Sequence, residues 1–273
     1  HSSNPRPFMM CNKKYFHIII TRMFEKINYW FRFVILYKNW LDLVINRIRK
    51  INSNIIILRN GYILKASTNS PLSIVTDEIF ILNRYTPKFM KIKSGDLVVD
   101  IGAHIGDFSI FSSVNKASIV YAYEPDPISY NDFLKNIKNN NIYNIKPLNL
   151  AVTNKNGLLN FYTNKINGGN SLYKTELQSK LIKIKSIKLQ DVFIYNKIDR
   201  IDFLKIDCEG SEGLIFKKIS KKLLNKINKI SLEYHNNVSE LNDRQLIKIF
   251  KTNNFKTIHK KISKDFGYIY AWR

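Results

Sequence analysis

The 273 residues are enough for one sizeable α/β domain with an added N-terminal piece, and 45% hydrophobic and 13% aromatic residues exclude a wholly disordered chain. The 44 Lys and Arg residues against 21 Asp and Glu residues give a formal charge of +23, which suits an anionic partner such as RNA or a membrane surface. Because Lys, Asn and Ile are used heavily along the whole chain, a bias in coding composition explains the charge equally well.

The cysteine content and the apolar segments indicate the cellular setting. Cys11 and Cys208 are too few and too far apart for a disulfide framework or a zinc site, so we expect a reducing, cytoplasmic environment. Four cations interrupt the apolar stretch Tyr15–Ile45, which therefore does not resemble a membrane span. No small-residue cleavage site follows an apolar run near the start, so we expect no signal peptide.

Residues 1–92 are predicted to form an accessory region of helices and a hairpin. From Phe16 to Ile51 apolar residues recur at spacings of three and four, with basic residues between them, which predicts one or two amphipathic helices. These helices could dock on the main domain, or lie on a membrane, since Trp30, Phe31 and Phe33 sit among cations.

Two short apolar runs then surround a turn signal. Ile55–Leu58 and Tyr62–Ala66 flank Arg59-Asn60-Gly61, and Asn-Gly between apolar runs favours a β-hairpin. A helix is predicted over Asp77–Tyr85.

Residues 93–273 are predicted to form the main domain, an α/β fold with a doubly wound, mostly parallel sheet. The apolar run Leu97–Ile101 opens it, and strands and helices alternate thereafter. Further strands are predicted at Ser118–Tyr123, Ile145–Val152, Phe203–Asp207 and Lys229–Tyr234, with helices starting at Gly106, Asp126, Ser211 and Ser239. An insertion should contribute strands at Leu158–Thr163 and Leu181–Leu189 joined by Gly168-Gly169-Asn170, and an antiparallel sheet edge should comprise Phe255–Ile262 and Gly267–Trp272.

The loop after the first main strand has the features of a cofactor site. Asp100, Gly102, Ala103 and Gly106 follow an apolar strand and precede a helix, where small residues let the backbone turn sharply and approach a ligand closely. Glu124 ends the next strand, where a carboxylate can accept both hydroxyls of a ribose. These features predict a nucleoside-containing cofactor.

The glycine pattern distinguishes between two such cofactors. The segment Gly102-Ala-His-Ile-Gly106 lacks the middle glycine of the dinucleotide motif G-x-G-x-x-G. Asp100 would repel phosphates, but it could pair with the ammonium group of an amino acid. The loop therefore favours S-adenosylmethionine over a nicotinamide cofactor.

Three segments together resemble the FkbM-type methyltransferases: Val98–Ser109, Tyr123–Asp126 and Asp202–Glu212. The likeness spans roughly Asn60 to Trp272. It implies a class I methyltransferase (Rossmann-like) fold that transfers a methyl group from S-adenosylmethionine, usually to an oxygen of a sugar or another small or carbohydrate-linked acceptor. The cofactor residues expected on this basis are Asp100, Gly102, Ala103, His104, Gly106, Phe108, Ser109, Glu124, Pro125 and Ala151.

One residue of this loop departs from the family pattern. His104 stands where the family generally has Asn, and both side chains can hydrogen-bond a cofactor carboxylate or the loop backbone. We therefore expect cofactor binding to be retained.

Methyl transfer to a hydroxyl needs an in-line approach and a base that takes the proton. The pocket of a doubly wound sheet lies beyond the carboxyl ends of its strands, where Asp207, Glu209, Glu233 and His235 are the best-placed titratable groups. Lys205 alternates with Asp207 and can share its face of the strand, so the catalytic candidates are Lys205, Asp207, Glu209 and His235. Asp207 could instead cap the next helix, and Lys205 could stabilise a carboxylate or an acceptor oxygen. A neutral His235 would be a suitable proton acceptor, and no metal site is assigned.

The helix predicted before the main domain carries two further polar candidates. Glu78 and Tyr85 could close the pocket from the N-terminal side, although a surface helix also explains them.

The sequence leaves three functions open. The first is O-methylation of a sugar, glycan or small-molecule hydroxyl, and the second is RNA methylation, which the +23 charge suggests. The third is a non-catalytic module of the same fold that binds nucleic acid or a membrane. Neither the acceptor nor the oligomeric state follows from the sequence.

Overall fold

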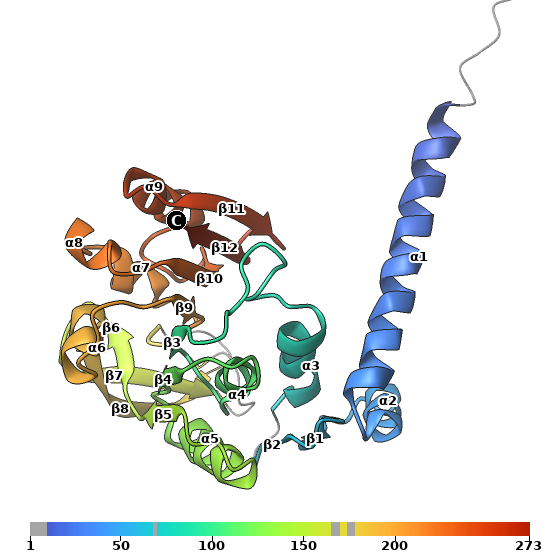
Figure 1. Ribbon diagram of the computed structural model, residues 1–273, viewed down its shortest axis with the longest axis horizontal. Coiled ribbons are helices and arrows are strands. Elements are labelled where there is room, and N and C mark those ends of the chain that lie inside the picture. Colours follow the sequence, from blue (N-terminus) through green and yellow to red (C-terminus); the bar gives the residue numbers. More distant parts are fainter. Residues whose placement is uncertain (1–9, 68–69, 165–169, 174–177) are drawn as a thin grey trace, which may run out of the picture.

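The computed structural model describes residues 10–67, 70–164, 170–173 and 178–273. Its centre is a seven-stranded sheet with the order β11-β12-β10-β9-β3-β4-β5 (Figure 1). The five strands from β5 to β10 run parallel, β12 runs antiparallel to β10, and β11 runs antiparallel to β12. The strands are β3 (Leu97–Ile101), β4 (Ile119–Tyr123), β5 (Ile145–Leu148), β9 (Phe203–Ile206), β10 (Lys229–His235), β11 (Lys256–Lys261) and β12 (Phe266–Trp272).

This order confirms the predicted doubly wound sheet with an antiparallel C-terminal edge. The chain runs outward from β3 through β4 to β5, and then returns to place β9 on the other side of β3. The order of the strands therefore reverses between β3 and β9, the position at which α/β sheets bind their ligands.

Local capping explains where the main helices begin. Asp126 accepts a hydrogen bond from the Ser129 N–H and precedes Pro127, so α5 begins there as predicted. The last helix begins at Asp243 rather than near Ser239, because Asn242 and its capping box set the start. The helices of this part are α4 (Asp107–Val114), α5 (Pro127–Asn139), α6 (Leu189–Tyr195), α7 (Glu212–Phe216), α8 (Lys221–Leu224) and α9 (Asp243–Thr252), of which α6 and α8 were not predicted.

The single strand predicted over Ile145–Val152 is wrong. The chain leaves the main sheet after β5, and β6 (Ala151–Thr153) joins a separate three-stranded sheet with β8 (Gln178–Lys188) and β7 (Gly157–Asn164). Asn149 stabilises the break, because its side-chain amide donates to the carbonyl oxygens of Glu124 and Pro125. The glycines predicted to join the insertion strands, Gly168 and Gly169, lie outside the described residues.

The N-terminal region contains helices and a hairpin, as the sequence pattern suggested. The helix predicted over Asp77–Tyr85 instead begins at Leu72 and ends at Ile81, with a π-helical second half. None of the described helices is both long and apolar enough to cross a membrane. The elements are α1 (Met10–Leu36), α2 (Trp40–Ile48), β1 (Ile55–Ile57), β2 (Ile63–Lys65), α3 (Leu72–Thr76) and η1 (Asp77–Ile81).

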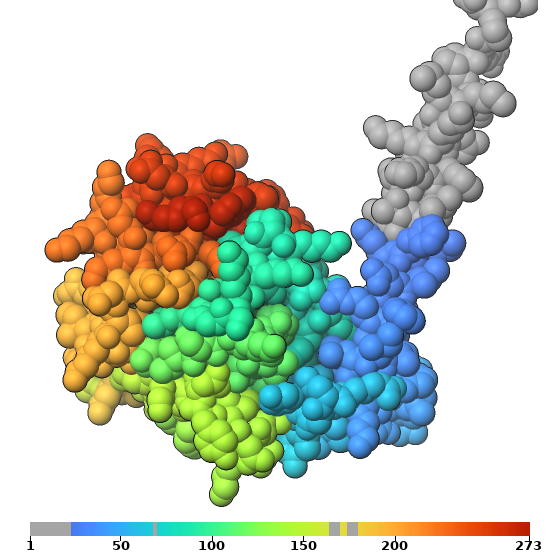
Figure 2. All heavy atoms as spheres, in the orientation of Figure 1, coloured from blue at the N-terminus to red at the C-terminus, as the bar shows by residue number. Residues whose placement is uncertain are grey.

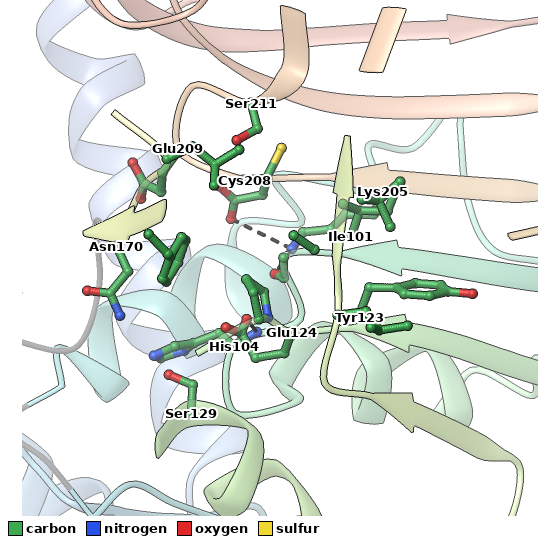
Figure 3. Close-up of a pocket in the computed structure, with 18 of the residues that line it drawn as sticks. Ile101, His104, Tyr123, Glu124, Ser129, Asn170, Lys205, Cys208, Glu209 and Ser211 are labelled. Carbon is green, nitrogen blue, oxygen red and sulfur yellow. Dashed lines mark hydrogen bonds and ion pairs between the residues drawn. The ribbon is translucent and has the colours of Figure 1, made fainter. Parts of the chain in front are cut away.

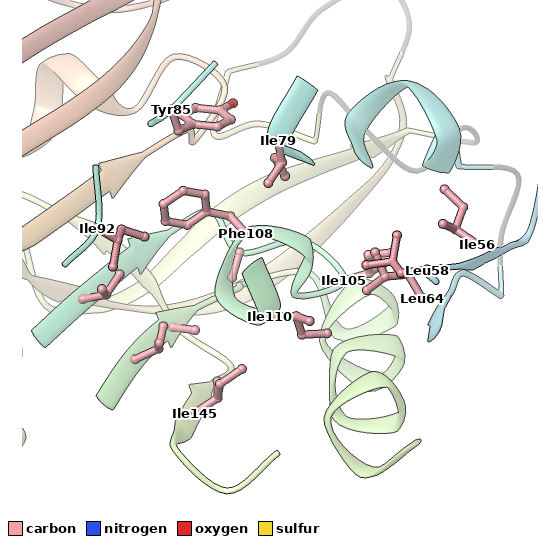
Figure 4. Close-up of a cluster of buried hydrophobic side chains, with 14 of the residues drawn as sticks. Ile56, Leu58, Leu64, Ile79, Tyr85, Ile92, Ile105, Phe108, Ile110 and Ile145 are labelled. Carbon is pink, nitrogen blue, oxygen red and sulfur yellow. The ribbon is translucent and has the colours of Figure 1, made fainter. Parts of the chain in front are cut away.

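The hairpin and the main domain contribute to one hydrophobic core. Ile56, Leu58 and Leu64 are buried in the same cluster as Ile105 and Phe108 of the loop and helix that follow β3 (Figure 4). Since packing rather than intrinsic propensity stabilises most short elements, this shared core fixes the hairpin against α5. The division of the chain after residue 92 stays a prediction.

Asn136 on α5 links the hairpin to the loop that follows β3. Its side-chain amide donates to the carbonyl oxygens of Lys65 and Ile105 and accepts from the Lys65 N–H. Asn136→Ala leaves these backbone groups without their partner, so we expect the free energy of unfolding to fall by about 2 kcal/mol in denaturant titration. The exposed Asn139 on the same helix supplies the control, and an equal loss for Asn139→Ala would contradict this account.

Candidate active site

A pocket lies where the strand order reverses, beyond the carboxyl ends of β3, β4 and β9 (Figure 3). Three parts of the molecule form its walls: the main sheet and its loops, the insertion sheet, and the segment around η1. Its described lining residues are Val75, Ile79, Tyr85, Ile101, Gly102, His104, Asp107, Tyr123, Glu124, Pro125, Ser129, Leu150, Ala151, Val152, Phe161, Asn170, Leu172, Lys205, Asp207, Cys208, Glu209 and Ser211.

A buried ion pair forms the floor of the pocket. Asp100 and Lys205 face each other across β3 and β9, with Lys205 Nζ 3.2 Å from Asp100 Oδ1. Lys205 also donates to the Gly102 carbonyl at 2.6 Å, and the Ser109 hydroxyl donates to Asp100 Oδ2 at 2.7 Å. Asp100 is fully buried and committed to these partners, so the expectation that it pairs with a ligand ammonium is wrong. It orients the loop instead.

Backbone geometry brings the loop close to β9. Gly102 has a φ of +78°, and a Cβ atom there would lie 1.7 Å from the Asp207 carbonyl oxygen. The N–H groups of Gly102 and Ala103 both donate to the Tyr123 carbonyl, which holds the loop against β4. Gly106 has a φ of +88° and packs against the Phe133 ring, 2.0 Å from the place of a Cβ. The two glycines therefore permit a path that other residues would block.

Glu124 at the end of β4 lies between the loop and the pocket. Its Oε2 accepts from the His104 N–H at 2.7 Å, and its Oε1 accepts from the Asp126 N–H at 2.8 Å. Burial raises the pKa of Glu124 to about 7. A carboxylate has about four acceptor positions, so two remain for hydroxyl donors in the pocket.

Two polar atoms in the pocket wall have no hydrogen-bond partner among the described residues. They are Nε2 of His104 and Oδ2 of Asp107, both buried. Buried polar atoms are normally paired, so this arrangement suits a ligand that brings both a donor and an acceptor. Asp107 was not among the predicted residues, although its position directly after Gly106 was a usable signal.

Tyr85 connects two carboxyl groups behind the pocket. Its hydroxyl lies 2.8 Å from Asp207 Oδ2 and 2.7 Å from Glu233 Oε2. The Tyr85 hydroxyl has one hydrogen, so it can donate to only one of the two carboxyl groups. The other contact is a hydrogen bond only if that carboxyl group is protonated and donates to the Tyr85 oxygen. Burial and the charge of Asp207 raise the pKa of Glu233, which is consistent with a shared proton.

Asp207 does not cap the following helix. Glu212 stabilises that turn instead, because its Oε1 accepts from the N–H groups of Cys208 and Gly210. The side chain of Asp207 is thereby left to face Tyr85 and Lys205, whose Nζ lies 3.7 Å from Asp207 Oδ2.

His235 is surrounded by carboxylates. Its Nε2 lies 3.4 Å from Glu209 and 3.5 Å from Glu233, and its Nδ1 lies 3.3 Å from Glu212. Burial opposes a charge on the ring, but the hydrogen bonds with Glu212 and Glu233 and the nearby negative charges outweigh it and raise the pKa of His235 well above 6.5. These contacts favour the protonated ring over the neutral imidazole that the sequence suggested.

Glu209 is the carboxylate of this group that faces the pocket. Its backbone has a φ of +52°, which is uncommon for a residue other than glycine, and its side chain is 38% exposed. Partial burial among other carboxylates raises the pKa of Glu209 to about 7 against the lowering effect of His235. No set of three or more His, Cys, Asp and Glu side chains in the described ranges is placed to hold a metal ion.

The predicted residues divide into pocket walls and supports. The walls include Gly102, His104, Glu124, Pro125, Ala151, Lys205, Asp207 and Glu209. The residues that lie behind these walls are Asp100, Ala103, Gly106, Phe108, Ser109 and His235. Sequence reasoning missed Asp107, and it missed Phe161 and Leu172 of the insertion, for which no local signal exists.

The strand order and the pocket at its reversal define a class I methyltransferase fold. A sequence model of the methyltransferase FkbM domain matches residues 100–270. The chain belongs to the FkbM methyltransferase family, and it is an S-adenosylmethionine-dependent methyltransferase by that membership.

Three solved structures that match the chain are distant from it in sequence, and no curated protein matches it. A methyltransferase FkbM from Methylobacillus flagellatus is 17% identical with a TM-score of 0.43, and the match covers 65% of this chain but only 44% of the other. A putative methyltransferase, yhhF, from Escherichia coli is 14% identical with a TM-score of 0.44, covering 78% and 93% of the two chains. M. capricolum TrmK in complex with S-adenosyl-homocysteine is also 14% identical, with a TM-score of 0.37 and coverage of 67% and 63%.

The donor set of the pocket fits S-adenosylmethionine. The two acceptor positions left on Glu124 suit the ribose hydroxyls. Asp107 Oδ2, which lies 3.7 Å from His104 Nδ1 but accepts no hydrogen bond among the described residues, and His104 Nε2 suit the ammonium and carboxylate of the methionine part. Apolar side chains that line the same pocket as Glu124 offer an environment for the adenine ring: Pro125, Leu150, Ala151, Val152, Phe161 and Leu172.

Removal of the cation from the buried pair should destabilise the protein strongly. Lys205→Met leaves the Asp100 carboxylate buried without its partner, so we expect the free energy of unfolding to fall by about 3 kcal/mol or more in denaturant titration. The Asp100→Asn/Lys205→Met double variant should recover part of this loss. Lys217→Met, which breaks an exposed pair with Glu240, should cost at most about 1 kcal/mol.

Cofactor affinity should depend on the ionisation of Glu124. Hydroxyl donors favour the ionised carboxylate, so affinity is present above the pKa of about 7 and is lost as the pH falls through it. Between about pH 8 and about pH 6 we expect the affinity for S-adenosylhomocysteine to fall about tenfold in calorimetry. Glu124→Gln should bind weakly without this dependence, and an unchanged pH profile in that variant would show that another group titrates.

Proposed function

We propose that the protein is an O-methyltransferase whose acceptor is an uncharged hydroxyl of a sugar, glycan or small molecule. The observation that carries this proposal is the set of carboxyl groups beyond β9 and β10. Asp207 and Glu209 line the pocket there. Glu233 does not line the pocket, but its carboxyl group contacts the Tyr85 hydroxyl, which also contacts Asp207. Carboxylates in such a position accept hydrogen bonds from the hydroxyls of a polyol and hold them in a defined orientation.

The charge of the pocket is opposite to that of the whole chain. Its described lining contains four carboxylic residues, Asp107, Glu124, Asp207 and Glu209. The basic residues of the lining are Lys205, which is committed to Asp100 and Gly102, and His104, whose Nδ1 lies 3.7 Å from Asp107 Oδ2. Carboxylates that are ionised repel phosphate groups at short range. The formal charge of +23 therefore arises from residues elsewhere, and the pocket gives no support to RNA as the acceptor.

Glu209 is the best-placed residue to take the proton of the acceptor hydroxyl. Its carboxylate is accessible from the pocket, and a pKa of about 7 leaves a large ionised fraction near neutral pH. The imidazolium of His235, 3.4 Å away, stabilises the ionised form and fixes its position. S-adenosylmethionine, when bound, supplies the methyl group, while these side chains orient the acceptor oxygen.

An acceptor panel with isotope-labelled S-adenosylmethionine tests this assignment. We expect methyl transfer to neutral saccharides or polyols, and none to phosphorylated sugars or to RNA, because the carboxylates repel phosphate. Glu209→Gln should lower kcat on the accepted substrate by a factor of about 10² or more with unchanged binding of S-adenosylhomocysteine.

Glu240→Gln is the matched control, since Glu240 forms an exposed ion pair with Lys217. It should leave kcat unchanged. Preferred methylation of RNA, or full activity of the Glu209 variant, would refute the proposal.

A further inference from the structure

The first two helices carry an unusual amount of exposed apolar surface. Along α1 it consists of Met23, Phe24, Ile27, Trp30, Phe31 and Ile35, each between 45% and 65% exposed. In and just after α2 it consists of Leu41, Ile45, Ile48 and Ile51. We call these ten residues the outer apolar stripe. Their spacings of three and four place the members on each helix along one side of it.

The opposite side of α1 is anchored to the body of the protein. Phe33 and Tyr37 are fully buried, and the hydroxyls of Tyr29 and Tyr37 donate to Asp77 at 2.6 and 2.7 Å. Arg47 of α2 pairs with the same carboxylate. Because this network fixes the inner side, the outer apolar stripe cannot turn inward and bury itself.

The segment that carries the stripe is strongly basic. Residues 22–51 contain seven Lys and Arg residues but only Glu25 and Asp42 as acidic residues. The cations Lys26, Lys38, Arg49 and Lys50 are exposed. These helices lie along one side of the molecule, and α1 extends beyond the body (Figure 1). Figure 2 shows the described atoms of residues 23–51 on that side of the surface.

We propose that the outer apolar stripe lies in the surface of an anionic membrane. Aromatic and aliphatic side chains on one side of a helix, flanked by Lys and Arg, are the composition of helices that rest in the headgroup region. Pairing with a second copy would bring the exposed cations Lys26, Lys38, Arg49 and Lys50 of both chains close together, and that repulsion disfavours a dimer through this side. An anionic bilayer complements both the apolar and the cationic residues.

Vesicle sedimentation with the full chain tests this proposal. We expect binding to vesicles of phosphatidylcholine mixed with phosphatidylglycerol, little binding to phosphatidylcholine alone, and release by added salt. Phe24→Ser/Phe31→Ser should lower the apparent partition coefficient by a factor of about ten or more, with unchanged circular dichroism and S-adenosylhomocysteine binding.

A matched variant removes two apolar side chains of similar exposure from other parts of the surface. Tyr143→Ser/Ile194→Ser should bind vesicles like the wild type. Absence of binding to the anionic vesicles, or an equal loss in both double variants, would overturn the proposal. A dimer in light scattering that Phe24→Ser/Phe31→Ser abolishes would also overturn it and identify a second copy as the partner.

Discussion

The site depends on one buried ion pair, Asp100 with Lys205. The two residues belong to adjacent parallel strands, β3 and β9, at the point where the strand order reverses. A buried charge is stable only when an opposite charge and further hydrogen bonds replace its lost hydration. Here the Ser109 hydroxyl donates to Asp100, and Lys205 donates to the Gly102 carbonyl. The Gly102 carbonyl belongs to the cofactor loop. The alignment of β3 with β9, which places Lys205 beside Asp100, therefore also determines the position of the loop that lines the pocket.

The distribution of charge carries more functional information than its sum. The chain has a formal charge of +23, yet four carboxylic residues and one committed lysine line the described pocket. The cations gather instead on exposed surfaces, including the two N-terminal helices beside the outer apolar stripe. The anionic membrane and the neutral acceptor that we propose would therefore contact different surfaces of the protein.

The acid cluster shows how neighbours set protonation. Tyr85 lies between Asp207 and Glu233 and has one proton for two contacts. His235 lies within 3.5 Å of three carboxyl groups, which raise its pKa. Neither state follows from the residue type alone, since the usual pKa of an isolated histidine or glutamate describes a group in water. In this pocket Glu209 and Glu124 both titrate near neutral pH, which suits proton transfer in the first case and ligand binding in the second.

The sequence by itself determined those features that depend on residues close to one another in the chain. The apolar run before Gly102, the glycines of the loop and the Asp126 cap are local, so the parallel sheet, the cofactor loop and the start of α5 could be predicted. Only the tertiary structure decided that β6 leaves the main sheet and that Asp100 forms an ion pair with Lys205. It also decided that the Tyr85 hydroxyl contacts Asp207 and Glu233, which are 122 and 148 residues away in the sequence. Contacts of that separation depend on how the whole chain packs, and no local pattern encodes them.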